Sequence, residues 1–363
     1  MAANQRSLRT ADTLAAAGLI EPDARPAIDA VARRYAIAIT PAVQALIERP
    51  DDPIGLQFIP DPAELIAAPH ETTDPIADDA LSPIKGVVHR YPDRALLKPL
   101  LVCPVYCRFC FRREHVGPDG GVLTDAELRA AYDWFAARPA IREVILTGGD
   151  PLMLSPRRLA AIVEALSAIP HIEILRVHTR VPVADPERTT DALVAALRTE
   201  KAMWLVLHVN HAREFTDEAA AAIRRIQAAA IPMLGQSVLL RGVNDNAAAL
   251  EALMRGFVEC RIKPYYLHHG DLAPGTAHLR TTLAQGQELM RALRGRVSGL
   301  CQPDYVLDIP GGHGKAPVGP NYLSKADSFS GTNSFAGKGE PHPESRYRVV
   351  DYCGDVHTYP PES

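Results

Sequence analysis

Residues 95–110 read ALLKPLLVCPVYCRFC, an apolar run that leads directly into three closely spaced cysteines. The apolar run is the first of seven candidate strands along the chain. They are Ala95–Val102, Glu143–Thr147, Glu173–Val177, Trp204–Val209, Met233–Leu239, Lys263–Leu267 and Tyr305–Ile309. Amphipathic helical patterns lie between several of them, and Thr124 and Ser155 provide readable helix starts. Alternating strands and helices predict a parallel sheet, either open or closed into a barrel, with its chemistry at the carboxyl ends of the strands.

Three parts are expected along the chain. Residues 1–85 are rich in Ala, Pro and Asp and predict a mostly helical N-terminal extension, residues 86–315 hold the strand and helix pattern, and residues 316–363 look like a loose polar tail. The formal net charge is only −4, and we found neither a basic run, nor an apolar signal core, nor an apolar stretch of membrane-spanning length. We therefore expect a cytoplasmic protein with no nucleic-acid or membrane partner.

The cysteine cluster is the most specific feature. Cys103, Cys107 and Cys110 have CxxxCxxC spacing, whereas the other three of the six cysteines are scattered. In a reducing compartment such crowding indicates metal binding rather than disulfides. Three thiolates on one tight loop suit a [4Fe–4S] cluster and leave one iron open. A zinc site completed elsewhere and buried cysteines without a ligand are the alternatives.

This spacing is the signature of the radical S-adenosylmethionine (SAM) superfamily, and the resemblance implies that SAM binds the open iron and is cleaved to a radical. Gly148, Gly149 and Asp150 follow the next strand and resemble the superfamily's motif for the amino group of SAM. By itself such a triplet is an ordinary turn.

A second glycine-rich segment, DIPGGHGK (residues 308–315), follows the last candidate strand. Glycines let the backbone approach a ligand closely, and Lys315 could contact a phosphate or form a Schiff base. The GxxxxGK[ST] spacing of a Walker A loop is absent. A solvated lysine on a surface loop is the alternative.

Together these segments resemble the lysine 2,3-aminomutase family over residues 74–320. The likeness is carried by several motifs in the right order: DPIADD (74–79), VHRYPDR (88–94), FRR (111–113), TGGDP (147–151), KPYY (263–266) and PGGHGK (310–315). The resemblance implies an incomplete (β/α)6-type radical SAM barrel. It implies pyridoxal 5′-phosphate (PLP) as a further cofactor, and an electron donor such as flavodoxin or ferredoxin.

The resemblance also assigns roles to single residues. Lys315 matches the lysine that binds PLP, Arg90 and Arg94 match PLP-facing arginines, and Gln236 matches a glutamine near SAM. The remaining matches concern the amino-acid substrate: Arg112 for its carboxylate, and Asp271 and Asp308 for its distal ammonium. Each could instead be a surface charge, a turn residue or a cap.

The implied reaction moves the amino group of L-lysine from C2 to C3, which makes β-lysine. There are two alternatives on the same scaffold: arginine as the substrate, or a role in the modification of elongation factor P. A non-catalytic iron–sulfur protein would not need Lys315 or the aspartates. Asn246 replaces a cysteine of the family's zinc site, and Cys353 is the only cysteine near the end of the chain. No structural zinc is therefore expected, and a homo-oligomer is left open.

Overall fold

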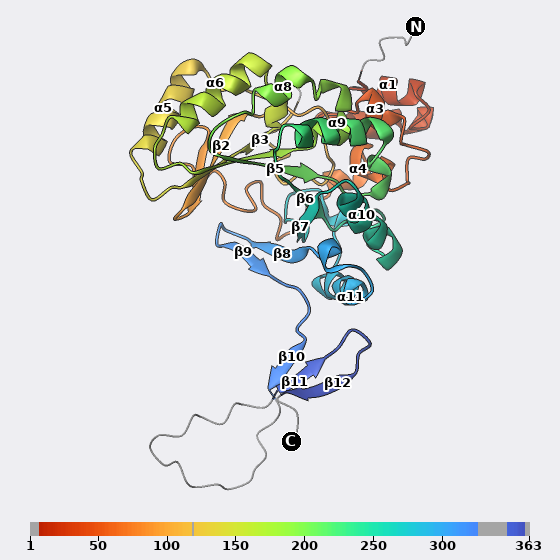
Figure 1. Cartoon of the computed structure of the whole chain (residues 1–363). Helices are drawn as coiled ribbons and strands as arrows, with labels where there is room; N and C mark the ends of the chain where they lie inside the picture. The colour runs from red at the N-terminus through yellow and green to blue at the C-terminus, as the bar shows by residue number, and fades with distance from the viewer. Residues whose placement is uncertain (1–6, 118–119, 326–346, 360–363) are drawn as a thin grey trace, which may run out of the picture.

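The computed structural model describes residues 7–117, 120–325 and 347–359. A nine-stranded sheet with the strand order β1 to β9 forms its centre (Figure 1). Strands β2 to β8 are parallel to one another, and β1 and β9 pair antiparallel at the two edges. The strands are β1 (Val87–Tyr91), β2 (Arg94–Leu100), β3 (Glu143–Gly148), β4 (Ile174–Thr179), β5 (Ala202–His208), β6 (Met233–Val238), β7 (Lys263–His268), β8 (Asp304–Ile309) and β9 (Gly314–Pro317).

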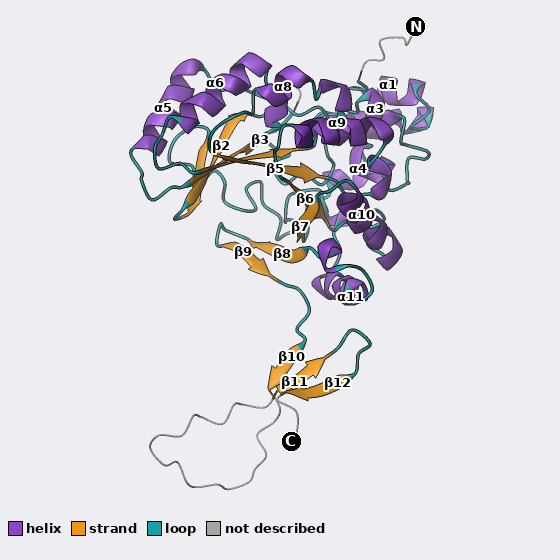
Figure 2. Ribbon diagram, viewed as in Figure 1, coloured by secondary structure: helices purple, strands orange, loops and turns teal. Residues whose placement is uncertain are grey.

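Helices follow the parallel strands and cover the outside of the sheet (Figure 2). The longer ones are α5 (Asp125–Ala136), α6 (Pro156–Ser167), α9 (Asp217–Ala228), α10 (Ala247–Glu259) and α11 (Leu283–Leu293), and β4 is followed by the short α7 (Val181–Ala184) and α8 (Asp191–Ala195). Thr124 caps α5 in a capping box and Ser155 caps α6, as predicted. Six strand–helix units therefore lead into β8, which confirms the incomplete (β/α)6-type barrel.

Alternation along the strands separates an apolar outer face from a polar inner face. On β4, Leu175 and Val177 are buried in the main core against the helices, while Arg176 and His178 have the opposite orientation. The same core holds Leu205 and Leu207 of β5. Polar side chains of the strands consequently gather inside the barrel.

The two sheet edges meet through side chains. The backbone amide of Lys315 on β9 donates to the hydroxyl of Tyr91 on β1, at 2.8 Å. Arg90 on β1 also contacts Asp308 on β8, at 3.4 Å. These side-chain contacts, rather than a strand ladder, join the edges, so the barrel is nearly closed.

The N-terminal segment consists of short elements that pack beside the cysteine loop. They are α1 (Ala11–Ala16), η1 (Pro22–Ala24), α2 (Arg25–Ala32), α3 (Pro41–Gln44), α4 (Gly55–Phe58) and η2 (Pro62–Leu65). Their apolar side chains form a second core cluster, which includes Val105 and which Cys107 contacts. None of the helices in the described ranges is long and apolar enough to cross a membrane.

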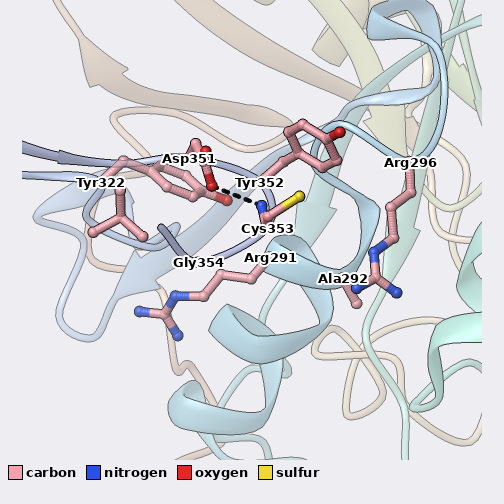
Figure 3. Close-up of a pocket in the computed structure, with 9 residues that line it drawn as sticks. Arg291, Ala292, Arg296, Tyr322, Asp351, Tyr352, Cys353 and Gly354 are labelled. Atoms are coloured by element: carbon pink, nitrogen blue, oxygen red, sulfur yellow. Dashed lines mark hydrogen bonds between the residues drawn. The ribbon is translucent and has the colours of Figure 1, made fainter. Parts of the chain in front are cut away.

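The C-terminal segment differs from the loose tail that the sequence suggested. Strands β10 (Leu323–Lys325), β11 (Tyr347–Val350) and β12 (Val356–Tyr359) form an antiparallel sheet that extends away from the barrel (Figure 1). The turn after β11 lies against the end of α11 (Figure 3). Tyr352 of this turn faces Gly295, which has a left-handed φ of +73°. A Cβ at Gly295 would lie 2.4 Å from Tyr352, so the glycine permits this contact.

We predict that Gly235→Ala destabilises the barrel. Gly235 lies on β6, and an added Cβ would lie 2.5 Å from the ring of Phe257 on α10. Overpacking of this kind costs about 1–3 kcal/mol. Equilibrium denaturant unfolding measures the loss, with Gly299→Ala as the control because a Cβ there meets no atom within 4 Å. Equal stabilities of the two variants would contradict this packing of α10 on β6.

Candidate active site

The cysteine loop follows β2 at the carboxyl ends of the parallel strands. Backbone bonds tie it to the N-terminal segment: the amide of Tyr106 donates to the carbonyl of Ala38 at 2.9 Å, and that of Arg108 to the carbonyl of Gln57 at 2.8 Å. The hydroxyl of Tyr106 donates to the carbonyl of Arg113 at 2.6 Å, which closes the loop on itself. The cysteines are thus presented by a loop whose shape is fixed from outside the barrel.

A buried carboxylate reinforces this loop. Glu64 accepts from Nε of Arg108 at 2.8 Å and from Nη2 of the same residue at 2.5 Å, and Arg113 donates to the same carboxylate. All three side chains are at most 1% exposed. Because the two arginines flank Cys110 in the sequence, Glu64 holds both sides of that ligand position.

The three thiols fit a shared iron–sulfur cluster. Burial, followed by repulsion from the neighbouring Cys107, raises the pKa of Cys110 to about 11. Burial also raises the pKa of Cys103 well above its usual value, with contributions from Asp150, Cys110 and Cys107. Buried thiolates that oppose one another's ionisation need a bound cation to stay ionised. Within the described ranges, no three His, Cys, Asp or Glu side chains lie close enough to hold a single metal ion.

The glycine turn after β3 packs against the strand that leads to the cysteines. A Cβ on Gly149 would lie 2.6 Å from the amide nitrogen of Val102, and Gly148 has φ +103°. The buried carboxylate of Asp150 accepts from the hydroxyl of Thr179 and the amide of Arg180, both at 2.7 Å. The carboxylate therefore fixes the turn, and contact of this turn with SAM stays a prediction.

Gln236 lies on the inner face of the barrel. It is paired in register with His208 on β5 and with Tyr266 on β7. The ring of His208 stacks on Phe109 of the cysteine loop, with 5.6 Å between the centroids. Gln236 is therefore one strand away from a side chain that contacts the cysteine loop.

Lys315 and the two predicted aspartates come together on the inner side. Nζ of Lys315 lies 2.7 Å from both carboxylate oxygens of Asp308, its cross-strand partner on β8. Burial would raise the pKa of Asp308, but His268 and Lys315 outweigh it and hold that pKa well below the usual value. Burial, followed by repulsion from Asp308, raises the pKa of Asp271 to about 7. The site thus has one fixed anion and one carboxyl group that titrates near neutral pH.

Arg112 and Arg90 lie beside this acidic pair. Nε of Arg112 donates to Asp78 at 2.7 Å, and Arg90 contacts both Asp78 and Asp308 at 3.4 Å. Arg90 therefore links the two acidic groups. Arg94 lies apart from this network: it pairs with Asp93, and its guanidinium covers the Tyr91 ring at 3.8 Å. A PLP contact for Arg94 stays a prediction.

Sequence reasoning missed two groups of residues here. Asp78 was noticed only as part of a motif, although it is the partner of Arg112. The inward histidines His178, His208 and His268 were also missed, and burial is the main cause that lowers the pKa of each. Polar residues at alternate positions of buried strands were the signal that could have identified them.

Comparison with known proteins defines the class and then the family. Residues 97–253 match the model of the radical SAM superfamily, which agrees with the cysteine loop and the barrel. Residues 290–355 match a family model described as lysine-2,3-aminomutase. The L-lysine 2,3-aminomutases of Acetoanaerobium sticklandii and Clostridium subterminale are each 42% identical to this chain over 289 residues, which cover 79% of this chain and 70% of theirs. The chain belongs to the lysine 2,3-aminomutase family.

One further relative acts as a reference for specificity. The glutamate 2,3-aminomutase of Clostridioides difficile is 33% identical over 330 residues, covering 90% of this chain and 78% of that protein. Relatives with this scaffold are therefore named for two amino acids, lysine and glutamate, whose side chains carry opposite charges.

We predict that Asp271→Asn stabilises the cofactor-free protein more at pH 8 than at pH 5. The folded-state pKa of Asp271 is raised to about 7, so its ionisation increasingly opposes folding as the pH rises from its unfolded pKa through 7. The amide removes this cost, which is largest above pH 7. Denaturant unfolding at the two pH values measures the gain.

The exposed Asp304 at the other end of β8 provides the control, Asp304→Asn, for the loss of a surface carboxylate. An equal gain for Asp271→Asn at both pH values would contradict the raised pKa.

Proposed function

We propose that this chain is a radical SAM, PLP-dependent 2,3-aminomutase that converts L-lysine into β-lysine. Cys103, Cys107 and Cys110 would hold the [4Fe–4S] cluster, and Gly148–Asp150 and Gln236 would lie beside SAM. A donor such as flavodoxin or ferredoxin supplies the electron. The chain's own contribution is to bind, orient and enclose the amino acid.

The observation that carries the substrate assignment is that protein groups occupy both charged positions of the site. The primary ammonium of Lys315 lies on Asp308, and the carboxylate of Asp78 lies on Arg112. Lysine carries the same two groups, a primary ammonium at one end and a carboxylate at the other. Its ammonium can therefore replace that of Lys315, and its carboxylate can replace that of Asp78, without changing the charge of either position.

Charge also separates lysine from its rivals. A glutamate side chain would place a third carboxylate beside Asp271 and Asp308, where burial and repulsion from Asp308 already raise the pKa of Asp271. An ammonium relieves that repulsion and offers three hydrogen-bond donors. Arginine also carries a distal cation, so product analysis with both amino acids decides between them.

PLP fits the position of Lys315. When bound, PLP supplies a conjugated system that stabilises the unpaired electron while nitrogen migrates. Lys315 anchors PLP covalently, and Arg90 and Arg94 are the cations for its anionic groups. The nearly closed barrel excludes water from the reacting carbons. Arg112 and the two aspartates hold the substrate at both ends, which fixes the carbon between them.

We predict that borohydride reduction of the PLP-loaded protein places the pyridoxyl label on Lys315. Peptide mapping by mass spectrometry locates it. Lys98 is the informative competitor, because it lies near Asp78 and Arg112 and burial lowers its pKa. Lys98→Arg should keep the label and Lys315→Arg should lose it. A label on Lys98 in the unaltered chain would refute the assignment.

We predict that Asp271→Asn and Asp308→Asn each lower kcat/KM for lysine by at least about 30-fold. Truncating one partner of a buried charge pair costs about 2–5 kcal/mol, and each 1.36 kcal/mol is tenfold. The assay is anaerobic turnover with SAM, PLP and reductant, with lysine, arginine and glutamate compared by mass and chromatography. Asp304→Asn is the matched control on β8. Full lysine activity in both variants, with normal cofactor content, would contradict the proposed ammonium site.

A further inference from the structure

Arg180, directly after β4, contacts a cysteine of the loop. Its Nη1 donates to Sγ of Cys107 at 3.1 Å. Its Nη2 donates to Oε1 of Gln57 at 2.5 Å and to Oε2 of Glu214 at 2.6 Å. The side chain is only 7% exposed. One edge of the guanidinium thus faces a sulfur ligand, and the other edge is anchored.

The anchors of Arg180 are themselves fixed by hydrogen bonds. Gln57 is fully buried on α4 and also accepts from Nδ2 of Asn210 at 3.1 Å. Glu214 accepts from the backbone amides of Asn210 and His211, both at 2.9 Å. Three segments therefore hold the guanidinium: the N-terminal α4, the end of β4, and the loop after β5.

This arrangement creates a directed dipole at the sulfur. Glu214 balances the charge of Arg180, but it lies on the Nη2 side, so the positive Nη1 edge is the part that faces Cys107. In a buried site a charge-assisted hydrogen bond is stronger than in water. Hydrogen bonds to cysteine sulfurs and local charge are two of the levers that set the potential of iron–sulfur clusters.

We propose that Arg180 is a positioning residue of the iron–sulfur site. It donates a charge-assisted hydrogen bond to the Cys107 sulfur and thereby raises the reduction potential of the cluster. The inference rests on the cluster of the proposed function. The added electron places more negative charge on the cluster and its sulfurs, so the donor stabilises the reduced form more than the oxidised form. Removing it makes the cluster harder to reduce.

The test is a redox titration of the anaerobically reconstituted full chain without SAM, followed by electron paramagnetic resonance of the reduced cluster. The double variant Arg180→Gln/Glu214→Gln removes the charged donor and its counter-charge together, so no buried charge is left unpaired. Arg180→Lys keeps the charge but loses the fork geometry. We expect near-normal iron content, a more negative midpoint potential in the double variant, and a smaller shift of the same sign in Arg180→Lys.

Arg213→Gln/Asp52→Asn is the matched control. Nη1 of Arg213 lies 3.1 Å from Asp52, and this pair joins the same two segments as Gln57 and Glu214. It should leave the midpoint potential unchanged.

Each other outcome decides against a specific claim. Normal iron with an unchanged potential overturns the tuning role of Arg180. Loss of iron in both Arg180 variants, with the control intact, shows a purely structural role and also overturns tuning. A wild-type chain that never binds iron and sulfide would instead refute the cluster itself, and with it the proposed function.

Discussion

The carboxylate of Glu64 is the contact on which the cysteine loop depends. It is fully buried, and it pairs with both Arg108 and Arg113, on the two sides of Cys110. Removing one partner of such a buried pair leaves an unpaired charge and typically costs about 3–5 kcal/mol. A loop without regular structure has few backbone bonds of its own to resist that loss. The N-terminal segment is therefore a structural part of the cysteine site, although it lies outside the barrel.

Charge balance within the barrel explains how so many ionisable groups share a small space. Asp78 and Asp308 are each satisfied by cations, whereas burial and repulsion from Asp308 raise the pKa of Asp271 to about 7. The buried histidines have lowered pKa values, so they add polarity without adding charge at neutral pH. The charges are therefore paired apart from the carboxyl group of Asp271. This is the arrangement expected of a site that admits a further cation.

Periodicity in the sequence was enough to predict strands β2 to β8, because each is an apolar run of the length of a strand. It did not reveal β9, where Gly314 and Pro317 disfavour a strand and only pairing with β8 creates one. The cysteine loop, the glycine turn and Lys315 were found from local spacing and motif order. Local spacing could not reveal two contacts between distant segments. Asp78 and Arg112 are 34 residues apart, and Arg180 and Cys107 are 73 residues apart. The short C-terminal strands likewise depend on cross-strand pairing rather than on a strong pattern of their own.

The join between β1 and β9 has a consequence for access to the interior. A barrel closed by a ladder must break a row of backbone bonds to open, whereas here side chains span the gap: the Tyr91 hydroxyl accepts from the amide of Lys315, and Arg90 contacts Asp308. Separating the edges therefore costs about 0.5–1.5 kcal/mol for the hydrogen bond, plus the loss of the ion pair and of local packing. Because Lys315 lies on β9, any separation of β9 from β1 would also shift the position of this lysine.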